Sequence, residues 1–240
     1  MAEQIEQYMR TLKLGGLAKN WRSVQYVSTE QYLTELLKIE LHEREVNRIN
    51  RMVKTAGFRV LKTLDDFVWN SAIEMPHDIT QEYMTDLQFI KPRENLIFLG
   101  AVGTGKTHLA TAIALKACQE GHRVRFFTAA ELANILLERN NKGTLNSFLN
   151  TLKKTELVII DEIGYTPISR SQANRFFTFI SDTYETNSIV FTTNKEITDW
   201  AEMMGDPVLT TAMLDRILHH ANCYSFRGES YRLKHPDIFS

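Results

Sequence analysis

The 240-residue sequence predicts an α/β fold with a parallel sheet, preceded by a small all-helical domain. Strand-like and helix-like patterns alternate from residue 64 onward, as they do in parallel sheets with crossover helices. A glycine-rich stretch at 100–107 stands between a strand pattern and a helix pattern, and a continuous apolar run at 157–160 ends in two carboxylates. Because the earlier residues show only helical periodicity, we expect a helical domain over 1–63 and an α/β domain over 64–240.

The helical domain is expected to contain three helices. Residues 6–14 form a short amphipathic piece, Gly15-Gly16 should break it, and residues 17–26 follow. Residues 28–31 read Ser-Thr-Glu-Gln and offer capping side chains for a longer helix over 32–55. Three arginines fall on the face opposite the apolar stripe of that helix: Arg44, Arg48 and Arg51.

These three arginines belong to a local excess of base between Lys38 and Lys62, which could grip the phosphates of a nucleic acid. The alternative is a solvated helix face with ion pairs four residues apart, such as Glu40 with Arg44. The sequence favours neither interpretation. The whole chain has 28 Lys and Arg against 29 Asp and Glu, so nucleic-acid binding would need such a patch or many copies in a multimer.

The α/β domain has a regular order of expected elements. Strands are expected at 95–99, 123–128, 157–161, 188–193 and 223–226. One helix is expected to begin at residue 108, and a second to cover 130–139. A third follows the turn at 140–143 and ends at about 154, and three more cover 172–186, 197–203 and 208–220.

Residues 100–107 read G-A-V-G-T-G-K-T and match the phosphate-binding pattern G-x-x-x-x-G-K-[ST]. The backbone N–H groups of such a loop, and the N-terminus of the helix after it, bind phosphate. Lys106 is expected to reach the β- and γ-phosphates of ATP, and Thr107 to ligate Mg²⁺. The expected nucleotide site comprises Gly100, Ala101, Val102, Gly103, Thr104, Gly105, Lys106, Thr107 and His108.

Two carboxylates follow the apolar run at 157–160. Asp161 would sit beside the phosphate-binding loop and hold Mg²⁺ together with Thr107. Glu162 would orient and polarise a water for attack on the γ-phosphate, which favours hydrolysis over phosphoryl transfer to a metabolite. The alternative is a surface Asp-Glu pair after a buried strand.

Two polar residues later in the chain are further catalytic candidates. Asn194 follows the strand at 188–193 and is expected to contact the γ-phosphate or the attacking water, although Asn is also common in turns. Arg216 is expected to reach the γ-phosphate bound by a neighbouring subunit, as an arginine finger in trans; a surface salt bridge is the alternative. His219 and His220 lack a metal-ligand spacing and are expected to be structural or surface residues.

The sequence predicts a cytoplasmic protein with no membrane partner. No apolar run approaches the roughly 20 residues needed to span a bilayer, and residues 1–4 do not resemble a signal peptide. Cys118 and Cys223 are far apart and are expected to be buried thiols, which suits a reducing compartment.

The order of phosphate-binding loop, Asp161-Glu162, Asn194 and Arg216 resembles that of the AAA+ ATPases. The chain is similar specifically to the IstB-like proteins, the helper ATPases of IstA/IstB-type insertion sequences, over nearly its whole length. Further matching segments include Leu64-Asp65-Asp66-Phe67, Thr128-Ala129-Ala130-Glu131-Leu132, Gly205-Asp206-Pro207-Val208-Leu209, Leu214-Asp215-Arg216-Ile217-Leu218-His219-His220 and Arg227-Gly228-Glu229-Ser230-Tyr231-Arg232-Leu233. It departs from the family at 101–103, often Pro-Pro-Gly, and at Thr183, often Arg.

The resemblance implies an ATPase that multimerises as a ring or spiral on double-stranded DNA, deforms it and presents it to an IstA-type transposase. A DnaC-like helicase loader is the alternative function, and a metabolic P-loop kinase is a third. The resemblance also implies an AAA+ core without a full helical lid, because the sequence ends soon after Tyr231-Arg232. A sensor arginine on such a lid would then be missing, or replaced by Arg227 or Arg232.

Overall fold

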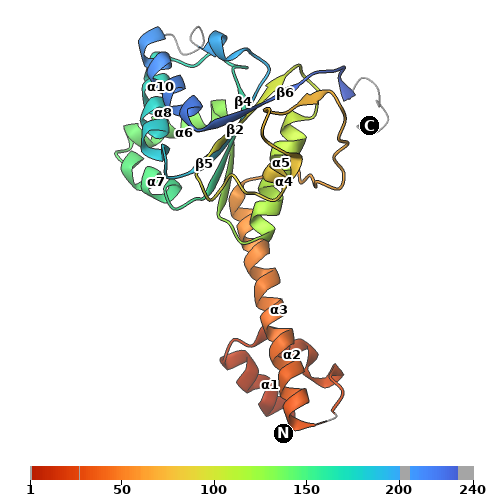
Figure 1. Ribbon diagram of the computed structural model, residues 1–240. Helices are drawn as coiled ribbons and strands as arrows, with labels where there is room; N and C mark the ends of the chain where they lie inside the picture. Colours follow the sequence, from red (N-terminus) through yellow and green to blue (C-terminus); the bar gives the residue numbers. More distant parts are fainter. Residues whose placement is uncertain (1, 27, 201–205, 232–240) are drawn as a thin grey trace. The chain divides into compact units, whose positions relative to one another are not determined.

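The computed structural model describes residues 2–26, 28–200 and 206–231 (Figure 1). The chain divides into two compact units, residues 1–52 and 53–240, and the long helix α3 (Thr29–Ala56) begins in the first and ends in the second. The first unit also contains α1 (Ala2–Thr11), α2 (Gly15–Asn20) and the 3₁₀ turn η1 (Trp21–Ser23). The expected helical character of the N-terminal region is therefore confirmed.

The two glycines after α1 do not act as the expected break, because α2 begins at Gly15. The reason lies in Glu40 of α3, whose Oε2 accepts hydrogen bonds from the backbone N–H groups of Gly16 at 2.9 Å and Leu17 at 3.2 Å. A Cβ at Gly16 would lie 2.8 Å from the Cβ of Glu43. Glycine thus lets α2 approach α3 closely, and a carboxylate from α3 satisfies the N-terminal N–H groups of α2.

A single mostly parallel sheet forms the second unit. Within the described residues, its strand order is β1-β6-β2-β5-β4-β3, with β2 to β6 parallel and β1 antiparallel to β6. The strands are β1 (Ile73–Glu74), β2 (Asn95–Gly100), β3 (Val124–Thr128), β4 (Leu157–Ile163), β5 (Ser188–Thr193) and β6 (Ala221–Phe226). The predicted parallel α/β class is confirmed, and the apolar run at 157–160 forms a buried parallel strand, β4.

Helices cover both faces of this sheet. The described helices are α4 (Gln81–Thr85), α5 (Lys106–Gln119), α6 (Ala129–Asn141), α7 (Leu145–Leu152), α8 (Arg170–Thr183), the 3₁₀ turn η2 (Ile197–Asp199) and α10 (Pro207–His219). Figure 1 shows α6, α7, α8 and α10 on one side and α5 on the other. Side chains of α6, α7, α8 and α10 pack with Ile97, Val158 and Phe191 of the strands into one apolar core. The helix expected over 197–203 runs into residues 201–205, which lie outside the described part.

Two observations bear on the expected compartment. No helix in the described part of the chain is long and apolar enough to cross a membrane. Both cysteines are free, but only Cys118 is buried, so the expectation for Cys223 was wrong. Side chains alternate along β6: Tyr224 and Phe226 face the core, and Cys223 therefore points to the other face.

Candidate nucleotide-binding site

The phosphate-binding loop joins the C-terminal end of β2 to α5. Neighbouring chain segments approach it so closely that two of its positions have room only for glycine. Gly100 and Gly103 have φ angles of +145° and +82°. A Cβ at Gly100 would lie 2.2 Å from the carbonyl oxygen of Phe226, and a Cβ at Gly103 would lie 2.1 Å from Oγ of Ser230. The carbonyl of Gly103 accepts a hydrogen bond from the N–H of Tyr231 at 2.9 Å. The segment after β6 is thus fastened directly to the loop.

Lys106 is the first residue of α5 and is buried despite its charge. Its Nζ donates to the carbonyl oxygens of Gly100 and Ala101, each at 2.7 Å, so the amine is held at the loop itself. Thr104 Oγ1 also donates to the carbonyl of Ala101, at 2.9 Å. Ala101 and Val102 are exposed, which leaves the outer side of the loop accessible to a ligand.

The structure brings the two expected Mg²⁺ ligands together. Asp161 lies near the C-terminal end of β4, is 4% exposed, and accepts a hydrogen bond at Oδ1 from Thr107 Oγ1 at 2.8 Å. The same carboxylate oxygen accepts a hydrogen bond from Thr192 Oγ1 of β5. A hydroxyl and a carboxylate in contact are oxygen donors of the kind that Mg²⁺ prefers.

Glu162 occupies an irregular point of the sheet. The β4–β5 register shifts between Ile160 and Ile163, and Glu162 has φ +60°, a conformation that costs a non-glycine residue roughly 1–2 kcal/mol. Its side chain is exposed, and its backbone N–H donates to Thr192 Oγ1 at 3.0 Å. Glu162 stands near the C-terminal end of β4, the same end of the parallel sheet at which the phosphate-binding loop leaves β2.

Thr192 is the residue that sequence reasoning missed. Its hydroxyl donates to Asp161 and accepts from the Glu162 N–H, so one buried side chain positions both acidic residues. The one sequence signal for it is the pair of threonines, Thr192 and Thr193, at the end of the apolar strand. Asn194 lies one residue beyond β5, is exposed, and stands at the same end of the sheet as the phosphate-binding loop, because β5 pairs in parallel with both β2 and β4.

Arg216 lies at the opposite end of the sheet. Its Nη1 donates to the carbonyl of Ala212 at 2.7 Å, and the guanidinium lies 5.1 Å from the ring centre of Phe177. It lines a small cavity with Asn95, the first residue of β2, whereas the phosphate-binding loop begins at the last residue of that strand. Five residue steps of strand correspond to about 17 Å. Arg216 is therefore remote from the loop of its own chain.

Of the two residues considered as a substitute sensor, the structure describes only Arg227. Arg227 pairs with Glu74 of β1, Nη2 to Oε2, at 2.9 Å, and its backbone N–H donates to the carbonyl of Ala72. Its side chain is thus held by the sheet edge. Arg232 lies outside the described residues.

His108, the last residue expected in the nucleotide site, faces the segment before β1. Its Nε2 lies 3.2 Å from the carbonyl oxygen of Thr63, and its ring packs edge-on against Phe67 at 5.4 Å between centroids. Burial lowers the pKa of His108 below its ordinary value and so favours the neutral ring. Phe67 also lies 3.1 Å from where a Cβ of Gly105 would stand, which places an aromatic wall beside the loop.

The three arginines expected to bind nucleic acid share one surface feature of the N-terminal unit. They line an open groove of about 840 Å³ together with two lysines and three glutamates, Lys13, Lys19, Glu40, Glu43 and Glu45. Arg44 pairs with Glu40 at 2.8 Å and Arg48 with Glu45 at 2.6 Å, while Arg51 Nε donates to the carbonyl of Asn47 at 3.2 Å. The ion pairs expected of a solvated helix face are present. The clustering of arginines that a phosphate-binding surface requires is present as well. Both partners are exposed only in the Arg48–Glu45 pair, and a pair of that kind contributes less than about 1 kcal/mol.

Nearly the whole sequence matches a protein family. The profile of the family described as IstB-like ATP binding protein matches residues 8–237. An ATP-binding protein of insertion sequence IS5376 from Geobacillus stearothermophilus is 37% identical over 240 residues, which cover 98% of this chain and 95% of that protein. The ATP-binding protein of insertion sequence IS21 from Pseudomonas aeruginosa is 39% identical over 204 residues, covering 85% of this chain and 77% of that protein.

Solved structures show the same fold at low sequence identity. The DnaC helicase loader aligns with a TM-score of 0.54 and 22% identity, covering 69% of this chain and 96% of that chain. The replication initiator DnaA bound to AMPPCP and single-stranded DNA aligns with a TM-score of 0.55 and 22% identity, covering 72% of this chain and 52% of that chain. The likeness supports the predicted P-loop AAA+ core.

Proposed function

Because the chain belongs to the family of IstB-like ATP binding proteins, we propose that it is the cytoplasmic helper ATPase of an insertion sequence. In this proposal it multimerises on double-stranded target DNA, deforms it, and recruits and stimulates an IstA-type transposase, and ATP hydrolysis resets the assembly. The observation that carries the proposal is the contact of Thr107 Oγ1 with Asp161 Oδ1, 2.8 Å apart, next to the exposed Glu162.

The residues present fit ATP with Mg²⁺. Thr107 and Asp161 would hold the ion, which when bound would neutralise charge on the phosphate oxygens. Lys106 would exchange the carbonyls of Gly100 and Ala101 for oxygens of the β- and γ-phosphates. The backbone N–H groups of residues 101–107 would surround the phosphates.

Hydrolysis needs a water that is oriented and deprotonated, and two side chains are placed for this. The Glu162 carboxylate would accept the proton of the attacking water, a role that contributes typically 10²–10⁴-fold in rate. Asn194, at the end of the adjacent strand, would orient the water or the γ-phosphate. Thr192 links the backbone of Glu162 to the carboxylate of Asp161. This link would hold the proposed base at a constant separation from the phosphates.

Arg216 would complete the site of a neighbouring subunit. Since it lies at the far end of the sheet from its own loop, a head-to-tail arrangement would bring it to the next subunit's γ-phosphate. An arginine finger makes its contact only when the neighbour is present, so ATP binding and assembly would stabilise each other. Heterologous contacts of this kind produce a ring or a spiral.

The helical N-terminal domain, residues 1–63, would bind the DNA. Arg44, Arg48 and Arg51 line the groove of each copy, and a multimer would repeat them along a duplex. Phosphate contacts carry no base information, so target choice would depend on DNA deformability rather than on sequence.

A mixing experiment tests the proposed site and its neighbour together. Glu162→Gln lacks the base but still supplies Arg216, whereas Arg216→Ala supplies no finger but keeps an intact site. Each variant alone should hydrolyse ATP at least 100-fold more slowly than the wild type. Mixed with DNA, they should regain a substantial part of the wild-type rate, because the intact site of one borrows the finger of the other. A mixture of Glu162→Gln with the double variant should stay inactive, and equal inactivity of both mixtures would refute action in trans.

A second experiment tests the role on DNA. ATPase rate and particle size are measured with ATP, with and without duplex DNA. A large complex that forms only with both, together with stimulated hydrolysis, supports the proposed function. A preference for single-stranded DNA would instead favour a helicase loader, whose fold this chain shares. A monomer with a constant rate regardless of DNA would contradict both.

A further inference from the structure

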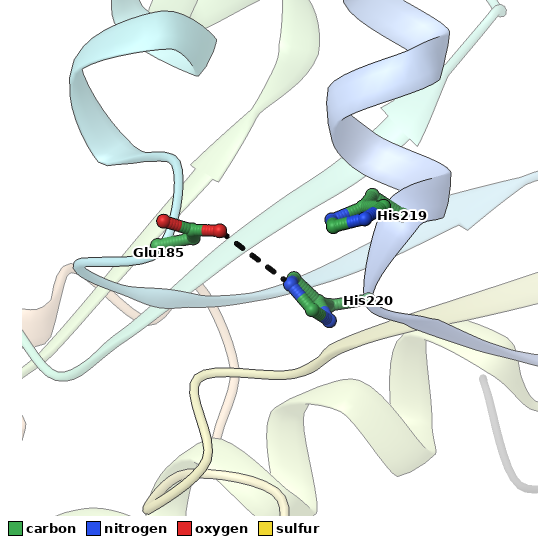
Figure 2. Close-up of side chains that lie close together, drawn as sticks. All are labelled: Glu185, His219 and His220. Atoms are coloured by element: carbon green, nitrogen blue, oxygen red, sulfur yellow. Dashed lines mark ion pairs between the residues drawn. The ribbon is translucent and has the colours of Figure 1, made fainter.

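A second group of potential ligand side chains lies away from the nucleotide site, on exposed surface at the start of β6. Figure 2 shows Glu185, His219 and His220 facing one another from two different segments. Each offers one ligand atom, and these atoms all lie within 4.8 Å of one another. In the ranges 2–26, 28–200 and 206–231, no other three His, Cys, Asp or Glu side chains come together in this way.

Two helix ends create this arrangement. α8 ends at Thr183, and Glu185 follows with φ +57°, which turns its side chain back toward the end of α10. α10 ends at His219, and His220 leaves the helix with φ −129° and ψ 51°. The two imidazole centroids therefore lie only 4.1 Å apart, and His220 Nε2 is 3.6 Å from Glu185 Oε1.

A further contact fixes one of the rings. The Tyr184 hydroxyl lies 2.8 Å from Nδ1 of His219. Hydrogen bonds of this kind orient histidine ligands at metal sites, and their loss typically costs 10–100-fold in metal affinity. Tyr184 also stacks near His220, with the rings 25° apart in orientation.

Charges of both signs surround the three ligand side chains. The two histidines stand at the C-terminal end of α10, where the last carbonyl groups carry partial negative charge, and Glu185 adds a full one. Arg93 and Arg216 line the same small cavity as Glu185 and His220, and Arg216 also donates to the carbonyl of Ala212 and lies over Phe177. All three side chains are exposed, so an ion reaches them without opening the core.

We propose that Glu185, His219 and His220 bind a divalent transition-metal ion, with Zn²⁺ as the best match. Two imidazoles and one carboxylate form a ligand set of zinc type, whereas Mg²⁺ and Ca²⁺ prefer oxygen ligands alone. Tetrahedral bonds of about 2.0–2.1 Å place neighbouring ligand atoms roughly 3.4 Å apart, so small side-chain rotations close the present separations. The fourth position remains for water or a side chain of another molecule.

Titration of the full chain with Zn²⁺ against a chromophoric chelator tests the site, without nucleotide or DNA. One equivalent should bind to the wild type, and Glu185→Gln, His219→Ala and His220→Ala should each weaken binding at least tenfold. His77→Ala is the matched control, because His77 pairs with Asp78 at 3.1 Å on an exposed surface but belongs to no such group of three. Binding unchanged in all three variants, or no stoichiometric binding by the wild type, would overturn the proposal.

Two further measurements separate ligation from structural damage. The wild-type protein loaded with Co²⁺ should show the intense visible bands of tetrahedral coordination, and a weak octahedral spectrum would contradict the assigned geometry. Tyr184→Phe, which keeps the ring and removes the hydroxyl, should still bind Zn²⁺ but about tenfold more weakly. Neither readout uses ATP hydrolysis. A failure of the proposed ATPase function would therefore leave both results unaffected.

Discussion

The nucleotide site and the groove of the N-terminal unit both gather charged side chains, but they hold them in opposite ways. In the nucleotide site, Lys106 is fixed by two carbonyls and Asp161 by two hydroxyls, beside a loop in which Gly100 and Gly103 leave no room for a Cβ. In the groove, the exposed Arg44 and Arg48 pair with glutamates of their own helix, Arg44 with the buried Glu40 and Arg48 with the exposed Glu45.

This difference matches the ligands that we propose for them. A small ligand with a defined charge distribution is bound and hydrolysed by groups whose positions are fixed before it arrives. A polyanion of many sequences is bound by side chains such as Arg48, which can exchange its exposed carboxylate partner for a phosphate at little cost. Substitutions should therefore have large effects in the first region and graded, salt-dependent effects in the second.

The largest effect is expected for Glu162→Gln. Removing the base should lower kcat by at least 100-fold while ATP affinity changes less than about threefold, since the amide keeps the shape of the side chain. The protein should then stay on duplex DNA in the presence of ATP, as measured by dissociation rate. Rapid release would show that hydrolysis does not reset the assembly.

A smaller but still large effect is expected for Thr192→Val. The valine removes the hydroxyl that links Asp161 to the Glu162 backbone, so we expect about a tenfold loss in kcat and roughly 1–3 kcal/mol of stability. Steady-state kinetics and thermal unfolding measure the two. Thr211→Val, whose hydroxyl donates only to a carbonyl of its own exposed helix, is the control and should change neither.

In the groove, Arg48→Gln should weaken DNA binding by only a few-fold at physiological salt. The slope of log affinity against log salt should become shallower by about 0.9 for each phosphate that the protein no longer neutralises. Lys142→Gln serves as the control because Lys142 forms a similar exposed ion pair with Glu138, outside the groove. An unchanged slope for Arg48→Gln would support the interpretation of a merely solvated helix face.

The smallest effect concerns acid stability of the N-terminal unit. Burial tends to raise the pKa of Glu40, but hydrogen bonds from Arg44, Leu17 and Gly16 outweigh it, and the net pKa lies below the ordinary 4.5. The ionised carboxylate therefore stabilises the unit above about pH 4.5, and this contribution is lost as the pH falls through the lowered pKa.

Hydrogen exchange at the amides of Gly16 and Leu17 measures this contribution. Below pH 4.5 we expect exchange to become faster than its intrinsic pH dependence predicts. The loss in protection free energy should be on the order of 1 kcal/mol. In Glu40→Gln the amides should be less protected at neutral pH and should lack this acid-induced loss. Equal pH profiles in both proteins would contradict the capping role.

The elements were predictable because local patterns determine them, and the missed features arise between segments that are distant in sequence. The strand patterns at 95–99 and 188–193 correspond to β2 and β5 nearly residue for residue, since each is a short apolar run bounded by polar residues. The start of α2 at Gly15 depends on a carboxylate more than twenty residues away, and the position of Glu162 depends on a hydroxyl thirty residues away. Arg216 was recognisable as a candidate, but its distance from its own loop follows only from the sheet.

The contact between Gly103 and Ser230 has a consequence for how such sequences diverge. The two positions are separated by more than half of the chain, yet a Cβ at one would overlap the hydroxyl of the other, and the neighbouring N–H of Tyr231 is bonded to the loop. The residue at each of these two positions therefore limits which substitutions the other position tolerates. We expect relatives with a bulkier residue at the position of Gly103 to carry a smaller one, or a shortened connection, at the position of Ser230.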